Sequence, residues 1–410
     1  MATGAGTAAV TADDVARARP AVADVVVRTP VLRSAALSNR CRADVVLKAE
    51  SLQRTGSFKL RGALAKLAAL GPACERGVTA GSAGNHGWAL SAAAAARGVP
   101  CEVYMPEHAP LAKIEGCDAL GATVRVGGES IEDALTAARR RADEAGMTFV
   151  HPFDDPVIVA GQGTLGLELL EDVPDLAKVI VPVGGGGLVS GVAIAVKSVR
   201  PEVEIVGVQV EAAAAYPASL RGGSPVTIEG AVTIADGIAV KRPGDVTLPL
   251  VREWVDDVVV VGEDEVAEAM VLLVERARLV VEGAGAVGVA ALLGGHTRAA
   301  QGGTTCVVLS GGNVDAGLLA SVARRHETEA GRRLVLFSRV PDRPGALARM
   351  LTQVADAGAN LVDVEHLREG VDLHVRETGV QLVLETRGRE HAAQVVDGLR
   401  AAGYDAVVVR

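Results

Sequence analysis

The sequence predicts an α/β protein with open parallel sheets, followed by a smaller βαββαβ unit. From about residue 25 to 320, short β-branched runs alternate with longer Ala- and Leu-rich runs at helical spacing. This alternation is typical of parallel sheets whose two faces are covered by helices. After a charge-rich stretch at 321–333, the same two patterns recur in the order strand, helix, strand, strand, helix, strand.

In the first part, the expected strands are Asp44–Ala49, Val78–Ala80, Cys101–Met105, Thr123–Val126, Val179–Val183, Ile205–Val210, Val258–Val261 and Thr305–Leu309. Expected helices include a run from Leu60 onward, Gly87–Arg97, Lys113–Leu120, Ile131–Ala145, Leu188–Val199, Glu263–Arg278 and Ala286–Leu293. Several strands run into glycines, which places loops at their carboxyl ends. That edge is the usual ligand-binding edge of an open α/β sheet.

The tail after the charge-rich stretch is long enough for a small domain of its own. Its expected strands are Leu334–Val340, Leu361–Leu367, Val380–Glu385 and Tyr404–Val409, and its expected helices are Pro344–Ala357 and His391–Ala402.

Composition narrows the functional classes. Of the 410 residues, 49% are apolar and only 2% are aromatic, so the core must pack through small and branched side chains. The net charge of −9 argues against sequence-independent nucleic-acid binding. No uncharged apolar run reaches the ~18 residues of a membrane span, and the N-terminus has no signal-peptide pattern. We therefore expect a cytoplasmic protein. Five cysteines without CxxC spacing predict no metal site.

Four consecutive glycines, Gly184 to Gly187, lie between an expected buried strand and the helix that begins near Leu188. Glycines let the backbone N–H groups turn toward an anion, and the helix adds its positive end, so the loop suits a phosphate. The dinucleotide pattern GxGxxG would need a glycine at 189, where the chain has Val189, and no GK[ST] of a P-loop follows. The alternative is a flexible turn.

Two further polar loops have the same placement, one from Ser82 to His86 and one from Ser310 to Asn313. Lys59 stands between Phe58 and Leu60. Burying an unpaired ammonium costs several kcal/mol, so Lys59 taken alone is expected at the surface. A phosphorylated aldehyde cofactor would explain all four features, because pyridoxal phosphate needs a lysine, an anion site and a partner for its ring nitrogen.

The motifs SFKLRGA, SAGNHGWAL, VPVGGGGL, TIADGIAV, VEGAGA and LSGGN, in this order, resemble the threonine dehydratase (threonine ammonia-lyase) family. These are pyridoxal-phosphate enzymes of the tryptophan-synthase-β-like fold, fold type II. The resemblance runs from about residue 25 to 320. It implies a two-lobed catalytic domain at 1–320, whose smaller lobe, about 50–155, is inserted in the larger one.

The same resemblance assigns roles to residues. Lys59 would be catalytic and carry the Schiff base, and Asn85 would bond the phenolic oxygen of the cofactor while Ser310 faces its pyridine nitrogen. The implied cofactor-binding residues are Phe58, Lys59, Asn85, Gly184, Gly185, Gly186, Gly187, Leu188 and Ser310. The substrate carboxylate would dock on the loop Ser82, Ala83, Gly84, Asn85 and His86.

The implied reaction is α,β-elimination of water from L-threonine, and also from L-serine, giving 2-oxobutanoate or pyruvate and ammonia. Two alternatives remain. One is a serine racemase, which shares the fold but carries a serine as second acid/base where this chain has Ala83. The other is a catalytically silent amino-acid sensor.

The chain departs from the family pattern at two places. Trp88 stands where glutamine is common, which would alter either the pocket wall or helix packing. Glu211 lacks the second carboxylate of a divalent cation site, which leaves open a monovalent cation held by carbonyl oxygens.

The tail resembles the ACT domain, an amino-acid-sensing module, over 334–410, with 321–333 as a linker. The residues implied at its effector site are Asp342, Pro344, Gly345 and Asn360. ACT domains pair side by side and bind effectors between them, so we expect a homo-oligomer, a dimer or a tetramer. A purely structural dimerisation arm is the alternative.

Overall fold

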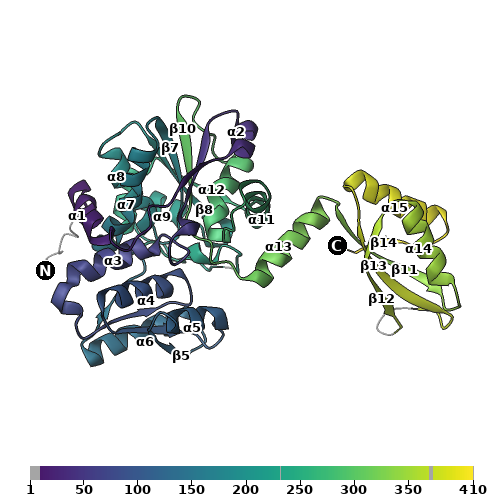
Figure 1. Cartoon of the computed structure of the whole chain (residues 1–410), viewed down its shortest axis with the longest axis horizontal. Coiled ribbons are helices and arrows are strands. Elements are labelled where there is room, and N and C mark those ends of the chain that lie inside the picture. The colour runs from purple at the N-terminus through teal and green to yellow at the C-terminus, as the bar shows by residue number, and fades with distance from the viewer. Residues whose placement is uncertain (1–9, 231, 369–372, 410) are drawn as a thin grey trace. The chain divides into compact units, whose positions relative to one another are not determined.

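The computed structural model describes residues 10–230, 232–368 and 373–409. The expected domain limits at 1 and 410 lie outside the described residues. The chain divides between Val314 and Asp315 into an N-terminal unit and a C-terminal unit, each compact in itself (Figure 1).

The larger sheet of the N-terminal unit has the strand order β1-β2-β10-β7-β8-β9. Neighbouring strands are parallel, except that β1 runs antiparallel to β2. The strands are β1 Val31–Arg33, β2 Val45–Ala49, β7 Leu176–Pro182, β8 Glu204–Val210, β9 Asp257–Val261 and β10 Thr304–Leu309. The prediction of parallel sheets is thus confirmed, with an antiparallel edge that was not expected.

A smaller parallel sheet has the order β5-β4-β3-β6, and its strands lie between β2 and β7 in the chain. They are β3 Val78–Gly81, β4 Cys101–Met105, β5 Thr123–Val126 and β6 Thr148–Phe149. Helices α4 Asn85–Arg97, α5 Leu111–Asp118 and α6 Ile131–Ala145 belong to this sheet (Figure 1). Helix α3, Lys59–Leu70, packs on both α4 and α7 and so joins the two parts of the unit.

The other helices of the unit are α1 Ala12–Val22, α2 Ala35–Cys41, α7 Pro156–Asp172, α8 Gly187–Lys197, α9 Tyr216–Gly222, α10 Thr247–Trp254, α11 Glu263–Leu272 and α12 Gly283–Leu293. Short helical turns are η1 Glu50–Leu52, η2 Gly71–Cys74, η3 Glu211–Ala213, η4 Asp236–Ile238 and η5 Leu273–Ala277, the last a π-helix.

Small residues allow the central helices to pack closely. A Cβ at Gly163 of α7 would lie 2.8 Å from the carbonyl oxygen of Gly191 in α8, and one at Gly191 would collide with the carbonyl of Val159. The backbones of α7 and α8 therefore touch where larger residues would hold them apart. This contact explains how a core with so few aromatic residues reaches high density.

The C-terminal unit begins with α13, Ala316–Glu329, so much of the stretch expected as a linker is helical. Its βαββαβ order is as predicted: β11 Arg333–Pro341, α14 Ala346–Asp356, β12 Asn360–Leu367, β13 Glu377–Glu385, α15 Arg389–Ala401 and β14 Val407–Val408. The sheet is antiparallel with the order β12-β13-β11-β14. The last strand is shorter than the expected Tyr404–Val409.

Among the described residues, no helix combines the length and the apolar character that crossing a membrane requires.

Candidate active site

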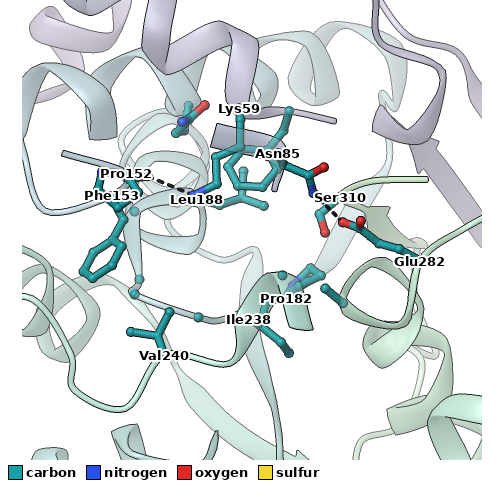
Figure 2. A pocket seen from close by; sticks show the side chains of 18 residues that line it. Lys59, Asn85, Pro152, Phe153, Pro182, Leu188, Ile238, Val240, Glu282 and Ser310 are labelled. Carbon is teal, nitrogen blue, oxygen red and sulfur yellow. Dashed lines mark hydrogen bonds between the residues drawn. The ribbon is translucent and has the colours of Figure 1, made fainter. Parts of the chain in front are cut away.

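A cavity lies at the carboxyl ends of the strands, where β7 and β10 of the larger sheet and β3 of the smaller sheet end. It is lined by Phe58, Lys59, Asn85, Pro152, Phe153, Gln162, Pro182, Gly184, Gly185, Gly186, Gly187, Leu188, Gly237, Ile238, Val240, Glu282, Ala284 and Ser310 (Figure 2). Every residue that the sequence assigned to the cofactor is in this lining. Of the expected substrate loop, Asn85 belongs to it.

Lys59 is the first residue of α3, and its Nζ lies in the cavity. The amine donates a hydrogen bond to the carbonyl oxygen of Pro152 at 2.8 Å and lies 5.2 Å from the centre of the Phe58 ring (Figure 2). Burial disfavours the ammonium form and lowers the pKa of Lys59 to about 8, although the carboxylate of Glu282 acts to raise it. A sizeable fraction of the amine is thus uncharged and nucleophilic at mildly alkaline pH.

The backbone before Lys59 is tied to the end of β10. Phe58 donates its N–H to the carbonyl of Ser310 at 3.1 Å, and Ser57 forms an isolated antiparallel bridge with Gly311. Lys59 and Ser310 are far apart in the chain, so these bonds hold two opposite ends of the site in register. Ser310 itself is buried.

A buried ion network anchors α3 one turn further on. The guanidinium of Arg61 is inaccessible to solvent and bonds both Glu50 and Glu168, at 2.8 and 2.7 Å. Lys48 extends the network to Glu168 at 2.6 Å and to Asp172 at 3.4 Å. Burial acts to lower the pKa of Arg61, but the attraction of the two glutamates outweighs it and holds that pKa above its usual value. The network connects β2, η1, α3 and α7.

The glycine loop approaches its neighbours closely. A Cβ at Gly185 would collide with the ring of Phe153, and Gly186 has a φ of +91°, in the left-handed region that glycine adopts without strain. The carbonyl of Gly186 already accepts the N–H of Ser190, which starts α8. The first N–H groups of α8 therefore lack helical partners and lie beside the cavity, a favourable place for an anion.

Asn85 is held on both sides of its amide. Its Nδ2 donates to Glu282 at 2.7 Å, and its Oδ1 accepts from Asn313 at 2.7 Å (Figure 2). Asn313 uses its other hydrogen on the carbonyl of Thr55 at 2.8 Å. Burial, and then the nearby charge of Asp236, raise the pKa of Glu282 to about 7, against the lowering effect of the Asn85 hydrogen bond. The orientation of Asn85 thus places its N–H₂ toward the cavity.

The loop from Ser82 to His86 is built differently from the expectation. The hydroxyl of Ser82 accepts the N–H groups of Gly84 and Gly87, at 3.2 and 3.1 Å, and so closes the loop on itself. His86 is buried with its Nε2 2.9 Å from the carbonyl of Val150, and burial lowers its pKa to about 3. A neutral imidazole bonded to a carbonyl supports the loop and carries no positive charge for a carboxylate.

Of the two departures from the family pattern, Trp88 acts in helix packing, because its Nε1 donates to the carbonyl of Lys113 near α5, at 3.0 Å. Glu211 is exposed in η3. In the described part of the chain, no group of three or more His, Cys, Asp or Glu side chains is placed to hold a metal ion.

Sequence reasoning gave no role to several residues of the site. Glu282 belongs to VEGAGA and Ile238 to TIADGIAV, so the motifs point to these positions without indicating what they do. Phe153 and Pro152 come from HPFDD, which follows the last strand of the smaller sheet. Their residue types are ordinary core types, and only their placement after a strand end was a signal.

The sequence profile of the family "Pyridoxal-phosphate dependent enzyme" matches residues 22–311, well over half of the chain. This chain belongs to that family. The match contains the whole cavity lining, from Phe58 to Ser310. The pyridoxal-phosphate family assignment agrees with the chemistry of the cavity, which combines a lysine of lowered pKa with a glycine loop at a helix start.

Individual relatives narrow this further. The L-threonine ammonia-lyase of Thermotoga maritima is 44% identical over 401 residues, covering 98% of this chain and 100% of the relative. The catabolic L-threonine dehydratase TdcB of Escherichia coli is 43% identical over 305 residues, covering 74% of this chain and 93% of the relative. The first match includes the C-terminal unit, whereas the second does not span the full chain.

Solved structures of the family share the fold. A threonine deaminase from the organism abbreviated T.th. is 40% identical with a TM-score of 0.70, covering 74% of this chain and 99% of the other. Maize serine racemase is 35% identical with a TM-score of 0.73, covering 78% of this chain and 99% of the other. The fold is therefore fold type II, and it alone does not separate dehydratases from racemases.

Proposed function

We propose that this protein is a pyridoxal-phosphate-dependent L-threonine ammonia-lyase. The observation that carries the proposal is the Lys59 amine, with a pKa of about 8, in one cavity with the Gly184–Gly187 loop. Pyridoxal phosphate, when bound, supplies the electron sink that makes the α-proton of an amino acid removable. The close similarity to two threonine-specific lyases supports threonine as the substrate.

The residues present fit this cofactor. Lys59 would hold the cofactor, and its freed Nζ would remove the α-proton of the substrate. The N–H groups at the start of α8 would bind the phosphate, and the Nδ2 of Asn85 is placed to donate a hydrogen bond into the cavity. Ser310, a neutral hydroxyl, would face the ring nitrogen. We keep the Ser82–His86 loop as the proposed carboxylate site, acting through its backbone N–H groups.

Incubation of the pyridoxal-phosphate-loaded protein with L-threonine is expected to yield 2-oxobutanoate and ammonia in equal amounts, and L-serine to yield pyruvate. Chiral analysis of the remaining serine tests the alternative. We expect at most a trace of D-serine, because the methyl of Ala83 cannot carry a proton. D-Serine formed faster than pyruvate would favour a racemase, and no product at all would favour the silent sensor.

The lowered pKa of Lys59 predicts a pH dependence. Only the uncharged amine attacks the cofactor aldehyde, so the rate of cofactor capture by apoprotein should rise with pH and reach half its maximum near pH 8. Stopped-flow absorbance measures this rate. Glu282→Gln removes the carboxylate that raises the Lys59 pKa, so its half-maximal pH should be lower than that of the wild type. A wild-type midpoint near that of free lysine, or an upward shift in the variant, would contradict the prediction.

We also propose that the C-terminal unit is an ACT-type regulatory domain that binds an amino-acid effector in a homo-oligomer. Gly345, at the start of α14, has a φ of +80°. Asp342 is engaged by Arg368 at 2.8 and 3.0 Å, and Asn360 donates to Glu385 at 3.2 Å. These bonds would be exchanged on binding, while Pro344 would keep the loop rigid.

Isoleucine, valine, threonine and serine are expected to include one that changes the half-saturating threonine concentration. Gly345→Ala strains the left-handed backbone at the effector loop and should reduce this response about tenfold or more, with the turnover of effector-free enzyme unchanged. The matched control is Gly398→Ala in α15, where an added Cβ meets open space. A wild type that responds to none of the four amino acids would refute the effector proposal.

A further inference from the structure

Two hydroxyl groups converge on one carbonyl of the glycine loop from behind. The hydroxyl of Thr247 donates to the carbonyl oxygen of Gly185 at 2.6 Å, and the phenol of Tyr216 reaches the same oxygen at 3.1 Å. Tyr216 and Thr247 are also 3.1 Å apart, oxygen to oxygen. Both side chains are buried and lie outside the set of described residues that line the cavity.

This clamp is itself held firmly. Thr247 Oγ1 accepts the N–H of Gly244 at 3.2 Å, which orients its own hydrogen toward Gly185. The main chain of Tyr216 donates to the side chain of Gln209 at 2.9 Å. Burial raises the pKa of Tyr216, so its phenol keeps its proton and stays a donor. The two hydroxyls therefore form a preorganised site for a single carbonyl oxygen.

The direction of one carbonyl fixes the direction of the next N–H. In a trans peptide the C=O and N–H groups point opposite ways, so a Gly185 carbonyl held toward Tyr216 turns the Gly186 N–H toward the cavity side. Glycine on both sides of this peptide makes rotation cheap. A released peptide could therefore turn its carbonyl oxygen toward a bound anion. The loop needs an external clamp because its own sequence imposes no orientation.

We propose that Tyr216 and Thr247 are positioning residues that give the cavity its affinity for the phosphate ester of the cofactor. They act through the Gly185–Gly186 peptide and touch neither cofactor nor substrate. This inference rests on the proposed function, because it takes pyridoxal phosphate as the ligand of the cavity.

The test compares pyridoxal phosphate with pyridoxal, which lacks the phosphate, as ligands of full-length apoprotein. Equilibrium titration followed by absorbance gives both dissociation constants. Tyr216→Phe and Thr247→Val each remove one hydroxyl at nearly constant shape. Each should weaken pyridoxal phosphate about tenfold, the effect of one lost hydrogen bond, and the double variant more. Pyridoxal should change by less than about twofold, since it presents no anion to the loop.

Thr247→Ser keeps the hydroxyl and should bind like the wild type. Tyr104→Phe is the control for loss of a phenol, because Tyr104 bonds Glu102 in the smaller sheet at 3.0 Å. Equal losses for the two ligands, or no loss for pyridoxal phosphate, would overturn the inference. If Thr247→Val fails to fold by circular dichroism, the Tyr216→Phe ratio decides alone. A wild type that binds neither ligand would instead refute the proposed function.

Discussion

Lys59→Ala is expected to lower threonine turnover by at least about 1,000-fold, since it removes both the attachment point of the cofactor and the base at the α-carbon. The amine meets the requirements for both tasks. It lies in the cavity with a pKa near 8 and is bonded to a single carbonyl oxygen, that of Pro152, which it can leave without breaking an ion pair. Release of 2-oxobutanoate measures the loss.

Lys197→Ala is the control for this substitution. Lys197 ends α8 and pairs with Asp256 at 2.7 Å, away from the cavity lining. Its loss should leave turnover within about twofold of the wild type, since surface ion pairs contribute little. A Lys59→Ala protein that keeps more than a tenth of wild-type turnover would refute the catalytic role of Lys59.

Arg61→Met is expected to reduce the free energy of unfolding of the N-terminal unit by about 3–5 kcal/mol, the cost of leaving buried carboxylates without their cation. Arg61 is fully buried, and Glu50 beside it is equally inaccessible. Both tryptophans, Trp88 and Trp254, lie in the N-terminal unit, so tryptophan fluorescence during urea unfolding reports on that unit.

Arg19→Met provides the comparison. Arg19 pairs with Glu171 at the surface, with both side chains more than 40% exposed, so its loss should cost no more than about 1 kcal/mol. Replacing Glu50 and Glu168 by glutamine in the Arg61→Met protein should restore part of the stability, because the uncompensated charges are then removed. Equal costs for Arg61→Met and Arg19→Met would show that the network is not a buried ion cluster in solution.

The arrangement of the sheets was predictable because most strands are buried, β-branched and followed by glycine. The same rule placed the glycine loop, the Asn85 loop and Ser310 at strand ends, so their meeting in one cavity followed from topology. Helix α7 was not among the expected helices. It contains Gly161, Gly163 and Gly166, which weaken helix propensity, and it is stabilised by packing against α3 and α8.

Other parts of the site depend on contacts between distant segments. The side chain of His86 was expected near an anion, yet it turns to Val150, a choice set by the neighbouring strand. Tyr216 and Thr247 stand 31 residues apart, and neither carries a motif. Glu282 becomes informative only when its burial and its bond to Asn85 are known. Such pairings arise from register and packing that a single sequence does not express.

Every side chain that lines the cavity is supplied by residues 58–310, inside the segment shared with the family, while the sensor-like βαββαβ unit is encoded after residue 314. Catalyst and candidate sensor are thus contiguous, separable stretches of one reading frame. Recombination at a single junction could exchange one tail for another without altering a catalytic group. Selection can therefore change which metabolite controls the enzyme while the chemistry is inherited intact.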